Sequence, residues 1–221
     1  ALIQGKSNLQ NTIEKLEPFF DNITLVVNVK SKSLFSKALK TINSSKTTLT
    51  VIESGFGPGH ALLNYMQKYD VLDDFILLYG DAYVNNIDVI EELIKYKSTS
   101  ELTIPLDLVT NPYVCFELNS NGDGIYVDFS RSNERHERGL KDRGLFKVKN
   151  GLLNHLKDFH NSCWKSNRYI TETGQFEFLY LIHLMFNKKV PAHCYVTDHT
   201  TSIFTYNTVE QLNKINSLGL Q

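Results

Sequence analysis

The sequence predicts an α/β fold in which a mixed, mostly parallel sheet carries helices on both faces. Helical and strand-like patterns alternate strictly up to residue 81, which is typical of βαβ units. Several strand-like segments are continuous apolar runs, as expected for strands that are covered on both sides. After residue 88 the pattern changes, and a hairpin signal indicates that the sheet also gains antiparallel strands.

The first half of the chain supplies the alternating elements. Residues 7–20 place apolar side chains at helical spacing, and Ser7 or Asn8 is available as the N-cap. Residues 22–29, "NITLVVNV", form a β-branched run that predicts a strand covered on both faces. The next elements are a helix at 33–43, a strand at 47–54, a helix that follows a loop within 57–69, and a buried strand at 75–81.

The second half adds antiparallel members. The turn "NSNGDG" at residues 119–124 separates two apolar runs and predicts a hairpin. Residues 132–144 are charged and contain two glycines, which is typical of a solvated loop and also compatible with a flap over a site. The other predicted elements are a helix at 87–98, a strand at 101–109, helical or strand-like stretches at 145–160 and 174–189, a strand at 190–198 and a closing helix at 208–218.

Composition excludes several classes of function. The formal net charge of -1 offers no basic field for nucleic acid. Cys115, Cys163 and Cys194 are odd in number and widely spaced, which argues against a disulfide framework and a zinc site and favours a reducing cytoplasm. No apolar run approaches the roughly 20 residues that cross a bilayer. We expect a single cytoplasmic domain over residues 1–221, without a nucleic-acid or membrane partner.

A glycine-rich turn, "ESGFGPGHALL" at residues 53–63, lies between a predicted strand and a predicted helix. Such turns let backbone N–H groups approach a phosphate or nucleoside, and the helix N-terminus adds a favourable dipole. The segment matches neither G-x-G-x-x-G nor the Walker A motif. On the local pattern, an ordinary strand-to-helix turn explains it at least as well.

The second candidate site is Gly80-Asp81, where an apolar strand ends. Gly and Asp are ordinary turn formers, so a plain turn is one interpretation. The other is a metal ligand, because open α/β sheets bind ligands beyond the carboxyl ends of their strands. Mg²⁺ typically takes one or two protein oxygens together with substrate phosphates and waters. The local residues leave both interpretations open.

The succession of segments resembles the sugar-1-phosphate nucleotidylyltransferases from about residue 1 to residue 215. The segments are "LQNTIEKL", "ITLVVN", "GPGHALL", "FILLYGDAYV", "ELTIPL", "YVCFELNSNGDGI", "DRGLFKV", "GQFEFLYLI", "VPAHCYV" and "FTYNTVEQLNKIN". The resemblance implies a three-layer, Rossmann-like nucleotidyltransferase fold. It also implies a Mg²⁺-dependent transfer of a nucleoside monophosphate from an NTP to a sugar 1-phosphate, in the service of cell-surface polysaccharide precursors, by a protein that can be a homo-oligomer.

The same resemblance assigns the nucleotide and metal sites. The family's Gly-Thr-Ala-x-Ala-Leu turn, which surrounds the nucleoside, corresponds to residues 57–62. Its strand-end Gly-Asp, which supplies a magnesium ligand, corresponds to Gly80-Asp81, and a second ligand before the final helix corresponds to Asn207. His60 and Asn207 look like the uridylyltransferase branch, which slightly favours UTP. The substrate-binding residues implied in the turn are Gly57, Gly59, His60 and Ala61.

The remaining assignments are looser. The family's Glu-Lys-Pro aligns near residues 130–132, so Arg131 is expected to supply the catalytic cation, although Arg is not a neutral replacement for Lys. Gly80 and Gly144 are expected to line the substrate site. The sugar-binding glutamate corresponds to Glu177 or Glu172, with Glu177 preferred. For either glutamate, a solvated helix charge is the alternative.

The sequence aligns just after the family's first strand and its Gly-rich "GGxGTRL" phosphate loop. Two functions from different classes are therefore expected. One is the active transferase, with the loop encoded upstream. The other is an inert nucleotide or nucleotide-sugar binding module of the same fold. A glycosyltransferase is a third, weaker possibility, because it predicts Asp-x-Asp where this chain has Gly80-Asp81-Ala82-Tyr83.

Overall fold

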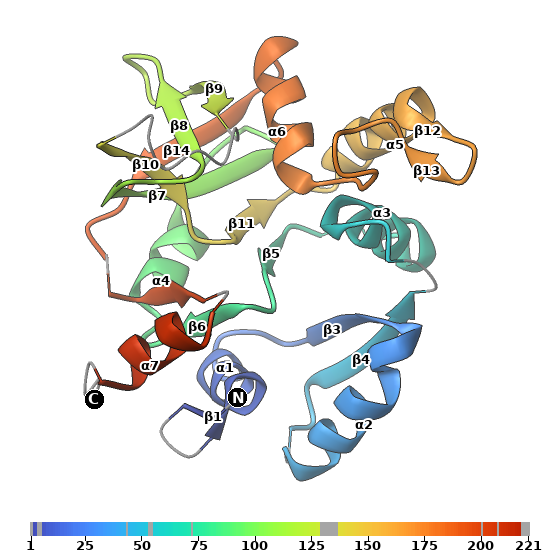
Figure 1. Cartoon of the computed structure of the whole chain (residues 1–221), viewed down its shortest axis with the longest axis vertical. Helices are drawn as coiled ribbons and strands as arrows, with labels where there is room; N and C mark the ends of the chain where they lie inside the picture. The colour runs from blue at the N-terminus through green and yellow to red at the C-terminus, as the bar shows by residue number, and fades with distance from the viewer. Residues whose placement is uncertain are drawn as a thin grey trace.

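A seven-stranded sheet forms the centre of the computed structural model (Figure 1). The structure describes residues 2–3, 6–42, 44–52, 55–71, 73–128, 137–199, 201–206 and 208–217. The strands run in the order β5, β11, β7, β10, β8 and β9, and β14 pairs with β7. Their bounds are β5 Phe75–Leu78, β7 Leu102–Thr110, β8 Cys115–Leu118, β9 Gly124–Asp128, β10 Arg138–Asp142, β11 Leu145–Val148 and β14 Ala192–Val196.

The prediction of a mostly parallel sheet is wrong. Within this sheet only β14 and β7 pair in parallel, whereas the β11–β5, β11–β7, β10–β7, β10–β8 and β8–β9 pairs are antiparallel. Because β11 is antiparallel to both β5 and β7, these two strands still point the same way. The sequence pattern did not predict the insertion of a later strand between them. The predicted hairpin at 119–124 is confirmed as the β8–β9 connection.

Helices cover both faces of the sheet, as predicted. On one face, α3 (Pro58–Tyr69), α5 (Leu152–Cys163) and α6 (Phe178–Asn187) contribute to a core that includes Phe146 of β11. On the other, α1 (Asn8–Leu16) and α4 (Asp88–Lys95) pack with the adjacent Leu145. Successive side chains of a strand point to opposite faces, so β11 divides the two cores. None of the helices in the described ranges is long and apolar enough to span a membrane.

A smaller unit lies beside the main sheet in Figure 1. β3 (Ile23–Asn28) and β4 (Thr47–Ile52) form a parallel two-stranded sheet, with α2 (Lys32–Thr41) between them in sequence. A single 3-10 turn, η1 (Val29–Ser31), precedes α2. Val26 in β3 is 37% exposed, so the expectation that this strand is covered on both faces is wrong. With only one neighbouring strand in the described chain, β-branched side chains in β3 stay partly open to solvent.

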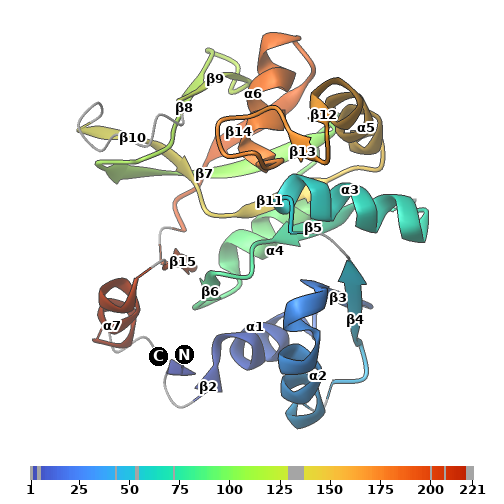
Figure 2. The ribbon, with the colours of Figure 1, turned by 45° about the vertical axis from the view of Figure 1, so that its right-hand side comes forward.

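The N-terminal and C-terminal segments meet at β6 (Ala82–Val84). β15 (Ile203–Thr205) pairs with β6, and α7 (Val209–Ser217) follows β15 (Figure 2). Ser7 caps α1, as predicted, by accepting a hydrogen bond from the backbone N–H of Gln10 at 3.1 Å. The charged stretch at 132–144 is not simply a loop, because β10 occupies its second half and residues 129–136 lie outside the described ranges. Two further pairs are short hairpins: β1 (Leu2–Ile3) with β2 (Lys6–Ser7), and β12 (Trp164–Lys165) with β13 (Arg168–Tyr169).

Candidate functional site

Asp81 lies in the turn between β5 and β6, and its carboxylate is exposed. Side chains of α1 fix the strand that follows. Asn8 Nδ2 donates to the carbonyl of Ala82 at 2.9 Å, and Asn11 Nδ2 donates to that of Val84 at 2.7 Å. Lys15 donates to the same Val84 carbonyl at 3.0 Å. Hydrogen bonds from one helix therefore hold the Gly80-Asp81 turn at the end of β5.

The C-terminal segment approaches the same turn. In the β6–β15 pair, Thr205 lies opposite Ala82. The next residue, Tyr206, donates its backbone N–H to the Asp81 carbonyl at 3.4 Å. Asn207 follows directly in the sequence but lies outside the described residues, as does Arg131. The structure thus brings the residue before Asn207 to Asp81, although 125 positions separate Asp81 from Tyr206.

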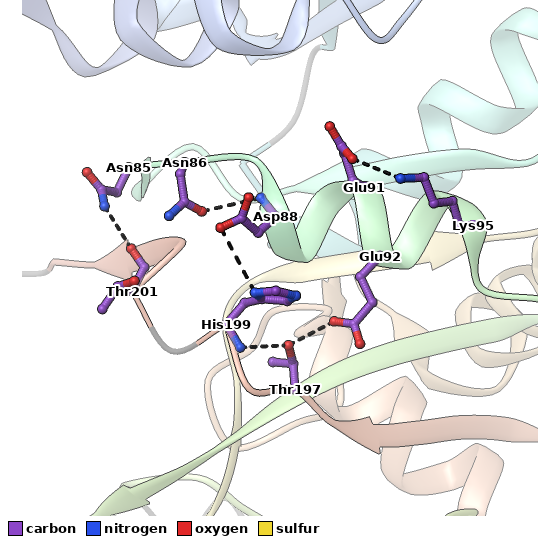
Figure 3. A network of polar contacts seen from close by, with 9 residues as sticks. All are labelled: Asn85, Asn86, Asp88, Glu91, Glu92, Lys95, Thr197, His199 and Thr201. Atoms are coloured by element: carbon purple, nitrogen blue, oxygen red, sulfur yellow. Dashed lines mark hydrogen bonds and ion pairs between the residues drawn. The ribbon is translucent and has the colours of Figure 1, made fainter. Parts of the chain in front are cut away.

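Polar contacts tie the β14–β15 connection to the start of α4 (Figure 3). Thr197 donates its hydroxyl to Glu92 at 2.8 Å and accepts the backbone N–H of His199 at 3.1 Å. The His199 ring lies 4.0 Å from the Asp88 carboxylate, and Asn85 donates to the carbonyl of Thr201 at 3.0 Å. These contacts hold the chain that leads into β15, and so they support the approach of Tyr206 to Asp81.

The glycine-rich turn packs on Phe176, which precedes α6. The Gly59 N–H donates to the Phe176 carbonyl at 2.8 Å, and the Phe176 N–H donates to the Phe56 carbonyl at 2.7 Å. A Cβ at Gly57, whose φ is +96°, would lie 2.7 Å from the Phe176 carbonyl oxygen. A Cβ on Gly59 would lie 2.5 Å from the Phe176 ring. Both glycines are therefore required by close packing.

His60 faces an aromatic cluster beside this turn. Its Nδ1 lies 2.5 Å from the Tyr169 hydroxyl, and His160 Nδ1 lies 2.8 Å from the same oxygen. Trp164 stacks on both imidazoles. Burial lowers the pKa of His60, and His160 lowers it further. Ala61 only closes the first turn of α3 by donating its N–H to the Gly57 carbonyl at 3.1 Å.

Three carboxylates influence Tyr79, which directly follows β5. Burial raises the pKa of Tyr79 well above its usual value, and Asp142, Glu177 and Asp81 raise it further. Gly144 packs on Tyr79: a Cβ there would lie 3.0 Å from the tyrosine, and the Tyr79 N–H donates to the Gly144 carbonyl at 2.8 Å. Gly144 is buried and has a φ of +66°, so a side chain there is strained.

Glu177 and Glu172 occupy different places. Glu177 directly precedes α6, without a side-chain capping hydrogen bond, and contributes to the electrostatic environment of Tyr79. Glu172 lies on a mostly apolar pocket of about 410 Å³ next to α5 and α6, together with Phe159 and Ile170. Gly80 is exposed beside Asp81, and a Cβ there would meet no atom within 4 Å. The structure thus places Gly144, Gly80 and Asp81 next to or in contact with Tyr79, whose pKa Glu177 also raises, whereas Glu172 lies at a separate pocket.

Sequence reasoning missed the charged residues of β10. Burial raises the pKa of Asp142, whereas the Gly144 N–H, which donates to its Oδ1 at 2.8 Å, and Lys141 lower it. Arg143 forms a buried ion pair with Asp107 and donates to the Ile203 carbonyl at 3.0 Å. One feature of the sequence could have indicated them. A short apolar run follows Gly144, and "LKDR" directly precedes that glycine, so a strand could have been expected on both sides of it.

The described residues at this edge of the sheet can supply part of a site for the Mg²⁺ that the resemblance implies. Asp81 is exposed and forms no ion pair with another described residue. Over the described ranges, no cluster of three or more His, Cys, Asp or Glu residues could hold a metal by itself. A single carboxylate, joined by an amide oxygen and substrate phosphates, is the donor set that suits Mg²⁺ rather than a metal held in an all-protein cage.

Comparisons with known proteins agree with the resemblance. No family model matches the chain. It is 28% identical over 180 residues to the bifunctional protein GlmU of Buchnera aphidicola subsp. Schizaphis graminum, covering 78% of this chain and 38% of that protein. It is 28% identical over 159 residues to GlmU of Methanococcus maripaludis strain C5, covering 71% of this chain and 36% of that protein. The chain therefore spans less than two-fifths of the length of these relatives.

Solved structures show the same fold. HddC from Yersinia pseudotuberculosis, complexed with GMP-PN, matches with a TM-score of 0.70 at 18% identity, over 99% of this chain and 88% of that one. The inositol-1-phosphate CTP transferase from T. maritima matches with a TM-score of 0.68 at 11% identity, over 100% and 87%. These likenesses establish the α/β nucleotidyltransferase fold. The sequence similarity to GlmU is consistent with the resemblance to the nucleotidylyltransferases.

Proposed function

We propose that the protein transfers a nucleoside monophosphate from an NTP to a sugar 1-phosphate and releases pyrophosphate. The observation that carries this proposal is the meeting of two distant segments at one turn: Tyr206, which precedes Asn207, hydrogen-bonds the backbone of Asp81. A phosphoryl-transfer site requires oxygen ligands at such a point, next to a turn that can receive a nucleotide. The Gly57–His60 turn is the segment that we propose binds the nucleotide.

In the proposed reaction, an oxygen of the sugar 1-phosphate attacks the α-phosphorus of the NTP. The bond from the α-phosphorus to the bridging α,β-oxygen breaks, and pyrophosphate leaves with that oxygen. No covalent enzyme intermediate is needed, so the residues act by positioning and by electrostatics. The Gly57–His60 turn receives the nucleotide, and Glu177 receives the sugar hydroxyls.

Asp81 and Asn207 are the residues that would hold Mg²⁺, which when bound disperses negative charge on the phosphate oxygens. Asp81 is suited to this role because α1 and β15 fix its backbone while its carboxylate stays exposed. Arg131 stays the proposed cation from the sequence resemblance. We also propose the cytoplasm as the compartment and a sugar nucleotide for polysaccharide synthesis as the product.

The nucleobase is left to experiment. His60 slightly favours UTP by its likeness to the uridylyltransferase branch, whereas the solved neighbours are named for GMP-PN and CTP. The test is a matrix of the four NTPs against a set of sugar 1-phosphates with the full-length protein and Mg²⁺, read by pyrophosphate release. We expect one NTP and one sugar phosphate to give signal only in combination, and EDTA to abolish it.

The inert binding module is the alternative. It is favoured by the sequence Thr205-Tyr206-Asn207-Thr208, which lacks the acidic residue that the family commonly has before its last helix. Silence across the whole matrix, together with saturable binding of a nucleotide or a nucleotide sugar, would establish this alternative and refute the transferase.

A further inference from the structure

Lys141 lies on the face of the sheet that looks toward β15. Leu106 belongs to the core packed by α3, α5 and α6, so the adjacent Asp107 points to the opposite face. In the β10–β7 register, Lys141 lies directly opposite Asp107, and cross-strand partners share a face. Arg143, two residues along, reaches β15 on this face through the Ile203 carbonyl. Lys141 therefore faces the strand whose end meets Asp81.

The Lys141 amine differs from the other partly buried lysines of the described chain. These others each donate to a backbone carbonyl: Lys15 to Val84, Lys46 to Glu17, Lys147 to Tyr96 and Lys149 to Ser98. Lys141 makes no hydrogen bond or ion pair with a described residue. Its Nζ lies 4.5 Å from the centroid of the Tyr113 ring, which leaves the donors of the ammonium group available.

The charges around Lys141 link it to the candidate site. Burial lowers its pKa, whereas Asp142, Asp81 and Asp107 raise it, so these carboxylates lie within electrostatic range of the amine. Arg143 is already committed to Asp107 in a buried ion pair. Of Lys141 and Arg143, Lys141 is thus the one whose donors are not used by the fold. A partly desolvated ammonium on the face that looks toward β15 is suited to an anion that arrives there.

Resting on the proposed function, we infer that Lys141 binds a phosphate group of a substrate at the Asp81 edge of the sheet. The chemistry is that of a phosphate oxygen accepting a charge-assisted hydrogen bond from the ammonium group. The phosphate belongs either to the NTP or to the sugar 1-phosphate, and the two are separated by measuring each affinity.

The test compares Lys141→Met, which removes the charge, with Lys141→Arg, which keeps it. Lys37→Met on α2, where the side chain is exposed, is the matched control. Binding of NTP with Mg²⁺ and binding of sugar 1-phosphate are measured separately by calorimetry at several salt concentrations, and KM for each is measured where turnover is present. Loss of a charge-assisted hydrogen bond is expected to weaken one of the two affinities by roughly 10- to 100-fold.

Lys141→Met is expected to make that affinity less dependent on salt concentration. Lys141→Arg is expected to restore much of the affinity, and Lys37→Met is expected to match the wild type. Thermal unfolding shows whether Lys141→Met is folded. Equal affinities of Lys141→Met and wild type for both substrates would overturn the inference even if turnover is present. If turnover is absent but Lys141→Met still weakens phosphate binding, the proposed function fails and the inference stands. Absence of any phosphate binding by the wild type overturns the inference.

Discussion

Replacing Gly59 by alanine should destabilise the protein, because the added methyl group has no room. Its Cβ would lie 2.5, 2.7 and 2.8 Å from three atoms of the Phe176 ring, about 1 Å short of ordinary carbon contacts of roughly 3.5–4.0 Å. The ring cannot easily move, because Phe176 is fully buried and stacks on Phe159 with centroids 4.2 Å apart. Overpacking of this kind costs about 1–3 kcal/mol.

The higher helix propensity of alanine partly offsets this cost. Gly59 is the second residue of α3, and alanine is better than glycine in a helix interior by up to about 1 kcal/mol. The net expectation is a loss of about 1–2 kcal/mol in the free energy of unfolding. For a chain of this size, each kcal/mol corresponds to about 2–4 °C in Tm.

The assay is urea unfolding of wild type, Gly59→Ala and Gly55→Ala. Gly55 is a matched control from the same loop, since it is exposed and a Cβ there would meet no atom within 4 Å. Gly55→Ala should stay within about 0.5 kcal/mol of wild type. If Gly59→Ala unfolds at the same urea concentration as Gly55→Ala with the same slope, the packing of this turn on Phe176 is incorrectly described.

Two further predictions concern titratable groups. Asp142→Asn should raise Tm at pH 8, because burial raises the pKa of Asp142 and ionisation opposes folding there, while the amide oxygen can still accept the Gly144 N–H. The gain should vanish near pH 4, and an equal gain at both pH values would contradict the burial argument. Acidification should lower Tm as the pH falls below about 6.5, because burial lowers the pKa values of His60 and His160 in the folded state. Replacing both histidines by Gln should flatten that decline. If the Tm of the double variant falls between pH 8 and pH 5 as steeply as that of the wild type, the two histidines are accessible to protons in the folded state.

The sequence predicted which segments are helices and strands better than it predicted which strands pair with each other. The alternation up to residue 81 reports local periodicity, and the helices and strands of that region are present. Strand neighbours depend on contacts between distant segments, so the insertion of β11 between β5 and β7 carried no local signal. The charged residues "LKDR" at 140–143 were part of a predicted solvated loop. In the structure, the buried Arg143–Asp107 ion pair instead holds the strand in this segment.

The candidate site was predicted in part for a similar reason. Gly57 and Gly59 were singled out because a glycine-rich turn is a local feature, and the structure gives a packing reason for both glycines in Phe176. Asp81 was singled out because it ends an apolar run. Asp142 and Lys141 became candidates only through the pairing of β10 with β7, which spacing along the chain does not report.

The central claim is that Asp81 holds the metal for nucleotidyl transfer. We predict that the full-length protein with Mg²⁺ and an [α-³²P]NTP transfers the label to a sugar 1-phosphate. Asp81→Asn should fold as the wild type does and lower kcat by roughly 100-fold or more, because charge stabilisation in the transition state is lost. Label transfer at the wild-type rate by Asp81→Asn, or transfer by the wild type that persists in EDTA, would contradict the account.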